Sequence, residues 1–461
     1  MTDTINNKMI YKKALALAVP MMIQNGITNA VGLVDNLMVG SLGTECMTAV
    51  SIVGQLLFVF NLAIFGGLSG PGIYGAQYFG KGDIEGVKNV FRLKWLISLF
   101  CVISGLLIFI FGGSFLIRLY LKGESADIDA GLTLEYARQY LDIMLWQLLP
   151  FGITQVYAGS LRETGESFKP MVAGVISVIT DIVLNYFLIY GKLCFPKLGV
   201  KGAAIATVIA RFVELATLLI WAHAKKNKHT FLKKIYTTFK LDFEKTKTIL
   251  KKGLPIFFNE FLWAGGIAIL TQNYSLRGLD VVAGLNISNA ICNLLNVVFI
   301  ALGSAVGIIS GQMLGASRYE EAKTSSKRLM WFSALISVIL TIVLISIAWV
   351  FPNAYDTTNA IRMTGTKFII ITALFFPIQG FLNALYFTLR SGGKTFITFL
   401  FDSVYSWALP VPVAFVLCKY TSLNIFWVYT IIQMFDLIKL AVGYILINKG
   451  IWITNLVDSD N

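Results

Sequence analysis

The chain has 461 residues, of which 56% are hydrophobic and only 14% are charged, and its mean hydropathy is +0.72. Soluble globular domains carry nearer a quarter charged residues, so this composition excludes a water-soluble fold. The formal net charge is +13, but the basic residues lie between apolar segments and form no stripe with stacking aromatics, which excludes nucleic acid as a partner. We predict an all-α integral membrane protein whose partner is the lipid bilayer.

Twelve windows of about 20 apolar residues predict transmembrane helices. An even number of spans places both termini on the same side of the membrane. The predicted spans lie at residues 14–40, 48–73, 92–115, 136–158, 169–190, 200–222, 252–273, 281–309, 329–351, 365–388, 396–418 and 423–447.

The charged loops predict the orientation of these spans. The stretch 222–252 carries ten lysines against Asp242 and Glu244, and the loops after the second and eighth spans are also basic. The loop with Glu124 and Asp127 is acidic and falls on the opposite face. Lysine and arginine collect in cytoplasmic loops, so we expect both termini in the cytoplasm. One basic loop, 192–201, disagrees with this assignment.

The two halves of the chain repeat one another. LRETGESF at 161–168 returns as LRSGGKTF at 389–396, and four single residues recur at one constant offset. The recurring residues are Pro20, Gln77, Gly80 and Lys88, which return as Pro255, Gln312, Gly315 and Lys323.

Each half holds six spans, so both repeats insert with the same orientation. We predict two pseudo-symmetric six-helix bundles, an N-terminal lobe at 1–224 and a C-terminal lobe at 251–461, joined by a cytoplasmic linker at 225–250. Parallel repeats suggest an axis along the membrane normal with a cavity between the bundles, as alternating access requires. A duplicated bundle without a transport role is the alternative interpretation.

No motif of catalysis or of metal chemistry is found in the sequence. The segment SGGKT at 391–395 resembles the end of a phosphate loop, but Thr388 stands where the first glycine is needed. The five cysteines form no CxxC pair, and His223 and His229 fall in the central loop, where we expect them to be solvated. We therefore expect no enzyme and no cofactor, and uphill transport would have to draw on an ion gradient.

Ionisable residues inside the spans are the candidates for function, because an unpartnered charge in hydrocarbon costs several kcal/mol or so. Asp35 is the only charge in the first span, and Asp181 and Asn185 share one face of the fifth. With Thr207 of the sixth span they supply two carboxylates, an amide and a hydroxyl at similar depths. This set suits a small cation or a shared proton, although Asp181 and Asn185 could instead only bond neighbouring helices.

A second candidate group lies in the other half. Glu260 is the only acid of the seventh span, and the repeat maps it onto Asn25. Glu260 either faces hydrated cavity near the cytoplasmic mouth or forms a second site for a proton or a cationic substrate.

Other intramembrane charges are spaced for pairing along a single helix. Arg211 and Glu214, like Asp436 and Lys439, stand three residues apart and should neutralise each other. Asp402 has no evident partner in the sequence.

Taken in order, the motifs resemble those of the multidrug and toxic compound extrusion (MATE) family of cation-coupled antiporters. The likeness spans nearly the whole chain, and the family has twelve spans in two lobes. The segments that carry it are LALAVPMMIQNGITNAVGLVDNLMVGSLG at 15–43, GAQYFGKGD at 75–83, SLRETGESFKP at 160–170, DIVLNYFLIYG at 181–191, GVKGAAIAT at 199–207 and GQMLGASR at 311–318.

This resemblance implies efflux of amphipathic or cationic small molecules in exchange for inward Na⁺ or H⁺. Asp35 matches the aspartate that helps to bind the coupling ion, and Asp181, Asn185 and Thr207 match its polar partners. A coupled Na⁺ would be held by Asp35, Asp181 and Asn185. The family commonly has Asn first and Asp four residues later in the fifth span, so the reversed order here prevents a direct transfer of ion preference.

The resemblance also bears on the second group. Some members use a seventh-span glutamate, near Glu260, and a tenth-span aspartate, whose place Gln379 takes here. We expect a monomer in the cell membrane. A lipid-linked precursor flippase of the same superfamily is the alternative function, a membrane-embedded enzyme is less favoured, and a channel fits two occluding bundles poorly.

Overall fold

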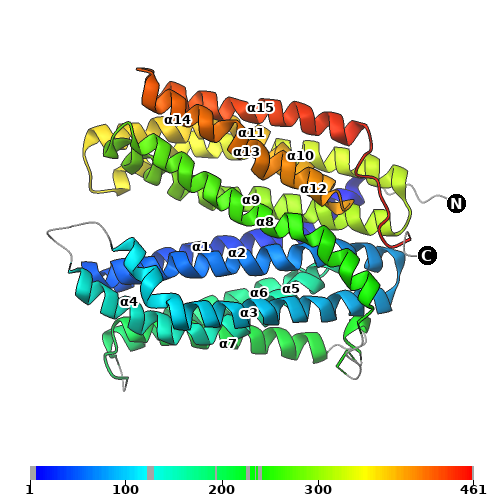
Figure 1. Ribbon diagram of the computed structural model, residues 1–461, viewed down its shortest axis with the longest axis horizontal. Helices are drawn as coiled ribbons and strands as arrows, with labels where there is room; N and C mark the ends of the chain where they lie inside the picture. The colour runs from blue at the N-terminus through cyan, green and yellow to red at the C-terminus, as the bar shows by residue number, and fades with distance from the viewer. Residues whose placement is uncertain are drawn as a thin grey trace. The chain divides into compact units, whose positions relative to one another are not determined.

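A computed structural model describes residues 7–121, 129–192, 195–224, 229–233, 235–236 and 241–458. Glu124, Asp127 and residues 225–228, 234 and 237–240 of the linker predicted at 225–250 lie outside these residues. The described chain is made of helices joined by short turns, which confirms the predicted all-α fold (Figure 1).

The helices form two compact units. The N-terminal unit comprises residues 23–75 and 84–246, and the C-terminal unit comprises 1–22, 76–83 and 247–461. The predicted lobes at 1–224 and 251–461 stay a prediction. The observed units differ from them because residues 1–22 and 76–83, in the first and second helices, belong to the C-terminal unit. One of these divisions follows Pro20, which cannot make the helical hydrogen bond to the preceding turn.

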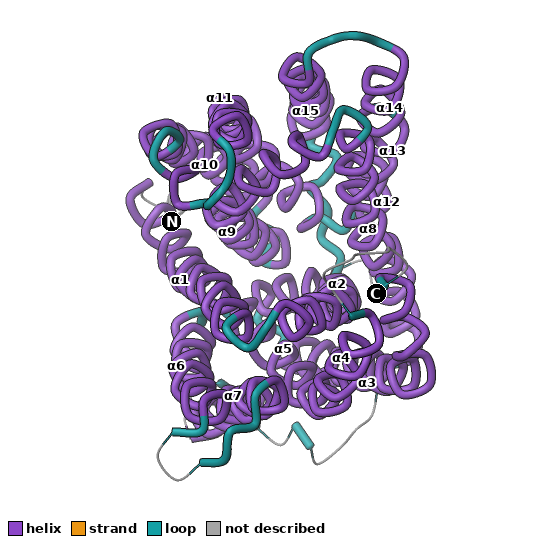
Figure 2. The backbone as a smooth tube through the Cα atoms, turned by 90° about the vertical axis from the view of Figure 1, so that its left-hand side faces the viewer, coloured by secondary structure: helices purple, strands orange, loops and turns teal. Residues whose placement is uncertain are grey.

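The N-terminal unit contains most of α1 and α2 and the helices that follow them. Among these, α6 and α7 pack side by side (Figure 2). The helices are α1 (Asn7–Gly40), α2 (Thr44–Lys81), α3 (Ile84–Tyr120), α4 (Ala130–Met144), a 3₁₀ turn η1 (Leu145–Gln147), α5 (Leu148–Glu163), α6 (Phe168–Tyr190) and α7 (Val200–Ala224), with a further turn η2 (Thr230–Leu232).

The C-terminal unit contains the remaining helices, of which α9, α10 and α11 pack side by side (Figure 2). They are α8 (Phe243–Ser275), α9 (Leu279–Gly315), α10 (Tyr319–Ile347), η3 (Phe351–Ala354), α11 (Asn359–Ser391), α12 (Thr395–Phe399), a π-helical segment η4 (Leu400–Val404), α13 (Tyr405–Ala408), α14 (Pro410–Tyr420) and α15 (Ile425–Asn448).

Within the described residues, 11 helical stretches are long and apolar enough to cross a membrane. The twelfth prediction, 136–158, falls on α4, η1 and α5, each of which is too short by itself. Pro150 explains the break, because it has no N–H to bond the carbonyl of Trp146 and its ring crowds that carbonyl. The chain therefore tightens into a 3₁₀ turn at Leu145–Gln147.

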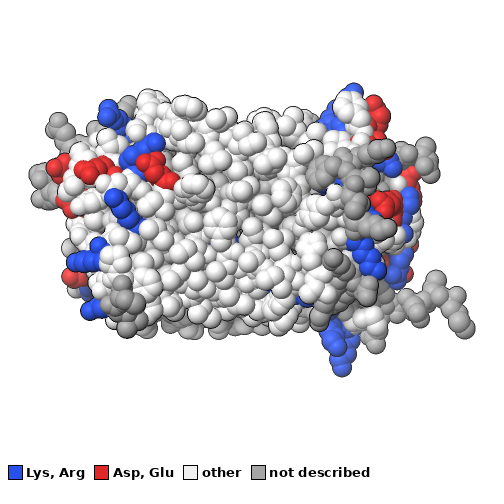
Figure 3. All heavy atoms as spheres, turned by 90° about the horizontal axis from the view of Figure 1, so that it is seen from below, with Lys and Arg blue, Asp and Glu red and all other residues white. Residues whose placement is uncertain are grey.

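The surface is that of a multi-pass membrane protein. Large apolar side chains on α3 point outward, with Phe111 84% and Phe100 71% exposed. Figure 3 shows one face on which charged atoms lie toward two ends and the band between them is uncharged. Such a band suits lipid tails and would be a liability in water.

Inside the C-terminal unit, each repeated glycine packs against the backbone of the repeated glutamine in the other copy. A Cβ atom on Gly80 would lie 1.9 Å from the carbonyl oxygen of Gln312, and one on Gly315 would lie 1.9 Å from that of Gln77. The two copies of the repeated motif thus pack backbone against backbone in a reciprocal contact. Only glycine, which has no Cβ atom, lets the two backbones approach this closely, and glycine stands at this position in both copies.

The C-terminal segment of the chain is anchored at the same place. Leu456 donates its backbone N–H to the Gln77 side chain at 2.7 Å, and Trp452 is completely buried. Lys81 binds the Asp458 carboxylate at 2.7 Å, and this interaction holds the pKa of Asp458 below its usual value.

The reciprocal contact predicts a sharp packing penalty. Gly315→Ala puts a methyl group against the Gln77 carbonyl, so we expect the free energy of unfolding to fall by about 1–3 kcal/mol. Thermal unfolding of the purified protein in detergent measures this. Gly112→Ala is the matched control, because its Cβ would meet nothing within 4 Å. Equal stability of the two variants would contradict the contact.

Candidate functional site

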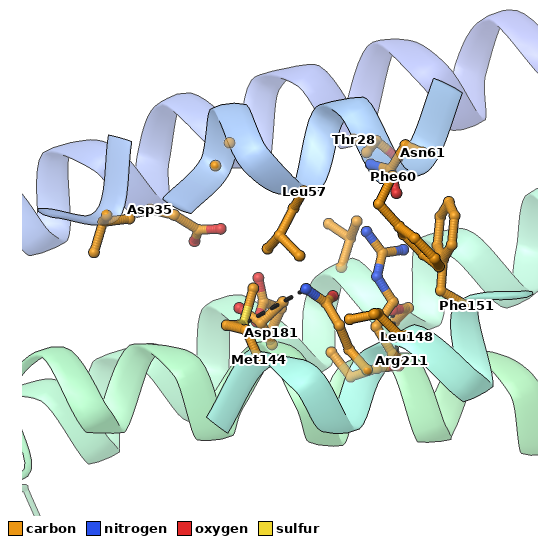
Figure 4. Close-up of a pocket in the computed structure, with 18 of the residues that line it drawn as sticks. Thr28, Asp35, Leu57, Phe60, Asn61, Met144, Leu148, Phe151, Asp181 and Arg211 are labelled. Carbon is orange, nitrogen blue, oxygen red and sulfur yellow. Dashed lines mark hydrogen bonds between the residues drawn. The ribbon is translucent and has the colours of Figure 1, made fainter. Parts of the chain in front are cut away.

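A cavity of about 410 Å³ lies inside the N-terminal unit. This volume falls in the range of pockets that hold small organic molecules. Side chains from α1, α2, α4, η1, α5, α6 and α7 line it (Figure 4). The turn at Leu145–Gln147 contributes Gln147 to the wall, so the break caused by Pro150 helps to shape the cavity.

The residues predicted for the coupling ion gather at one end of this cavity. Asp35 enters from α1 and Asp181 from α6, and both carboxyl groups border this end of the cavity (Figure 4). Asn185 donates its side-chain N–H to Asp35 Oδ1 at 2.8 Å. Thr207 of α7 also lines the cavity, and its hydroxyl donates to the carbonyl of Ala203 at 3.1 Å. The structure therefore places Asp35, Asp181 and Thr207 in the wall of one cavity, with Asn185 bonded to Asp35, whereas their role in binding an ion stays a prediction.

Two oxygen atoms at this end have no hydrogen-bond donor. They are Oδ1 of Asp181 and Oδ1 of Asn185, both buried. The two side chains are 6% and 1% exposed, so bulk water does not reach them freely. Buried polar atoms are nearly always partnered, and an orphaned one calls for an explanation such as an ion or a proton.

The buried Asp181 carboxyl and the half-buried Asp35 carboxyl share one end of the cavity, which imposes a charge constraint. Both cannot remain ionised in a medium of low dielectric constant unless a cation or a proton offsets their repulsion and desolvation. Oxygen donors of this kind suit a hard cation such as Na⁺, whereas softer transition metals prefer nitrogen and sulfur. The donor set therefore fits both ions that the resemblance implies.

The opposite end of the cavity carries a cation and aromatic rings. Arg211 binds Glu214 at 2.9 Å, which confirms the predicted pair, and its guanidinium carbon lies 5.5 Å from the centroid of the Phe151 ring. Arg211 and Phe151 both border the cavity, together with Phe60 and Asn61 (Figure 4).

Sequence reasoning missed that this pair borders the cavity. It treated Arg211 and Glu214 as neutralising each other on a helix face. It also overlooked the uncharged polar groups of the wall, such as Gln55 and Tyr140. A search restricted to charges cannot find amides and hydroxyls, and their position inside apolar spans was the available signal.

The structure does not bring the second predicted group together. Glu260 lies 3.9 Å from Arg390, and Gln379 bonds Gln433 at 3.4 Å. Asn25 belongs to the other unit, is half-buried and does not line the cavity. A joint site of these three residues stays a prediction that no observed contact supports.

Two expectations about other ionisable groups were wrong. Lys439 pairs with Asp402 at 2.6 Å rather than with Asp436 of its own helix, so Asp402 does have a partner. The histidines are not simply solvated, because His229 is 5% exposed and lies 2.9 Å from Lys169 Nζ. His223 contacts the Tyr157 hydroxyl at 3.0 Å.

Comparison with known proteins connects this chain to a family. The family model MatE matches residues 20–187 and 255–416. The chain is 26% identical to the probable multidrug resistance protein YoeA of Bacillus subtilis, over 91% of this chain and 89% of that one. It is 24% identical to the probable multidrug resistance protein NorM of Thermotoga maritima, over 90% and 87%.

Among solved structures, the fold is similar to the outward-facing conformation of a multidrug resistance MATE family transporter of the MOP superfamily. The TM-score is 0.86 at 20% identity, and the match covers 96% of each chain. At this identity the likeness establishes the two-lobed fold.

The geometry of the Arg211 pair makes a testable prediction. Arg211→Met leaves the buried Glu214 carboxylate without its cation, so we expect the free energy of unfolding to fall by about 2 kcal/mol. Adding Glu214→Gln should restore most of this loss, because no uncompensated charge remains. Chemical unfolding of the three proteins tests the pairing, and a double variant no more stable than Arg211→Met would refute it.

Proposed function

Because the chain belongs to the MATE family of multidrug efflux transporters, we propose that it exports amphipathic or cationic small molecules in exchange for Na⁺ or H⁺ bound at Asp35 and Asp181. Both relatives named above are described as probable multidrug resistance proteins, which supports export of foreign compounds. The bacterial relatives support a place in the plasma membrane, and the basic loops support cytoplasmic termini. We propose that it works as a monomer.

The observation that carries this proposal is the pair of unpartnered buried oxygens on Asp181 and Asn185 beside the Asp35 carboxyl. Such acceptors bind a cation or a proton strongly, because the alternative is an uncompensated buried charge. A site of this kind can hold its ion while closed to water and release it when water enters. That property is what an ion-coupled carrier needs.

Coupling follows if the ion and the substrate favour different conformations. A ligand shifts a conformational equilibrium only by its difference in affinity for the two states. A bound Na⁺ or H⁺ would cancel one of the two negative charges of Asp35 and Asp181 and so weaken the attraction of the same cavity for a cationic substrate. Binding of one would therefore disfavour binding of the other, and each would drive the opposite step of alternating access.

The cavity wall supports a cationic, partly aromatic substrate. Its charged lining residues are Asp35, Asp181 and Glu214 against one cation, Arg211. The aromatic rings of Phe60 and Phe151 and the thioether of Met144 adapt to bulky apolar groups.

The same lining disfavours the flippase alternative. A lipid-linked precursor with a phosphate head would need an excess of basic side chains, and the cavity has an excess of carboxylates.

The proposal predicts that Asp35→Asn loses gradient-driven efflux while the protein still folds and inserts, since an amide cannot exchange a cation or a proton in the same way. The measurement uses purified protein in liposomes with a fluorescent cationic dye, under a Na⁺ gradient and a pH gradient imposed separately. The gradient that drives the wild-type protein identifies the coupling ion.

Asp142→Asn is the matched control, because Asp142 is half exposed, pairs with Arg138 and does not line the cavity. It should transport normally. Undiminished efflux by Asp35→Asn would remove the assignment of the ion site.

A further inference from the structure

A second polar cluster, which the proposed efflux mechanism does not use, lies largely shielded from solvent in the C-terminal unit. Lys439 of α15 places its ammonium nitrogen 2.6 Å from Asp402 Oδ1. Asn259 of α8 donates its side-chain N–H to Asp402 Oδ2 at 3.1 Å. We call these three residues the Asp402 cluster. The side chains of Asp402 and Lys439 are only 18% and 14% exposed.

Neighbouring groups hold the cluster in one orientation. The Ser403 hydroxyl donates to Asn259 Oδ1 at 2.7 Å, so the amide nitrogen must turn toward Asp402. Asp402 and Ser403 stand together on η4, the π-helical segment. π-Helical turns are rare and are often found at functional sites. The Lys439 ammonium also lies 5.3 Å from the centroid of the Phe401 ring.

The Asp402 cluster parallels the ion site of the N-terminal unit. In each unit, one carboxylate accepts a hydrogen bond from an asparagine on another helix, Asp35 from Asn185 and Asp402 from Asn259. The difference lies in the second partner. Asp35 meets another carboxyl, Asp181, whose Oδ1 is orphaned, whereas both oxygens of Asp402 are bonded.

The charges around Asp402 also differ from those around Asp35. Asp436 stands one turn before Lys439 on α15 and adds a second acid near the same ammonium, so the cluster does not carry an excess of positive charge. Glu260 is matched separately by Arg390. Lys439 thus balances the charge of the Asp402 carboxylate, and the Asp402 cluster is not a binding site for anions.

We propose that the Asp402 cluster is a preformed site for a small monovalent cation, which the protein fills with the tethered ammonium of Lys439. A lysine ammonium is a compact positive charge on a flexible stem. It binds carboxylate oxygens through three N–H donors, whereas Na⁺ would bind them through its charge alone. The C-terminal unit therefore needs no cation from solution, and a soluble cation competes for this site only when Lys439 is absent. In combination with the proposed function, this leaves Asp35 and Asp181 as the site of the exchangeable ion.

The test removes the tether and offers free cations. Lys439→Ala is introduced into full-length protein that also carries Asp35→Asn and Asp181→Asn, so that the N-terminal site no longer responds to cations. Thermal unfolding is followed in NaCl, in methylammonium chloride and in tetramethylammonium chloride at equal ionic strength. Stability is the readout, so the result does not depend on whether the protein exports drugs.

We expect Na⁺ or methylammonium, but not the bulky tetramethylammonium, to raise the unfolding midpoint of the Lys439→Ala protein by at least about 2 °C. The parent with Lys439 should show no such rise. Adding Asp402→Asn should abolish it. Lys419→Ala is the matched control, since Lys419 lies over Phe415 and Tyr420 in the same unit without an observed carboxylate partner.

Three results would overturn the proposal. The first is a folded Lys439→Ala protein that does not respond to any of the cations. The second is a parent protein that already responds with Lys439 in place. If Lys439→Ala cannot be purified without cations, the proposal requires that Na⁺ or methylammonium during purification rescues it, and failure in all salts is the third.

Discussion

The constraint on which this structure depends is that a carboxylate inside an apolar helix bundle must be given a partner. Water cannot supply it there, and an isolated buried charge costs several kcal/mol or more. The protein meets this constraint in two ways. Many of these charges are paired with another side chain. Among the buried side-chain atoms of the described residues that have no hydrogen-bond partner, Oδ1 of Asp181 and Oδ1 of Asn185 are the only carboxylate or amide oxygens.

Ion pairs and hydrogen bonds between side chains supply partners for other charges of the N-terminal unit. Lys94 is 1% exposed and pairs with Glu163, and Arg162 donates to Gln24 at 2.7 Å. These groups link α3, α5 and α1 and have no freedom to exchange an ion. The Oδ1 atoms of Asp181 and Asn185 differ from these groups because they accept no hydrogen bond, which is why the proposed exchangeable ion is assigned to them.

The local geometry of both units depends on breaks in helical regularity and on close backbone contacts as much as on charge. Pro150 forces the turn between α4 and α5, and that turn brings Gln147 into the wall. In the C-terminal unit, the π-helical turn carries Asp402 beside Asn259. The repeated glycines Gly80 and Gly315 provide the close backbone contact that a side chain would prevent.

The helical membrane fold, the repeat and the identity of the buried carboxylates were decided by the sequence itself. Hydropathy and proline or glycine positions are local properties, and every predicted span falls on a helix or a broken run of helices. Asp35, Asp181 and Asn185 could be selected because a polar residue in an apolar span is visible without coordinates. Only the tertiary structure decided the partners. Lys439 chooses Asp402 over Asp436, and Arg211 borders the cavity, because the rotation and packing of helices determine which side chains meet.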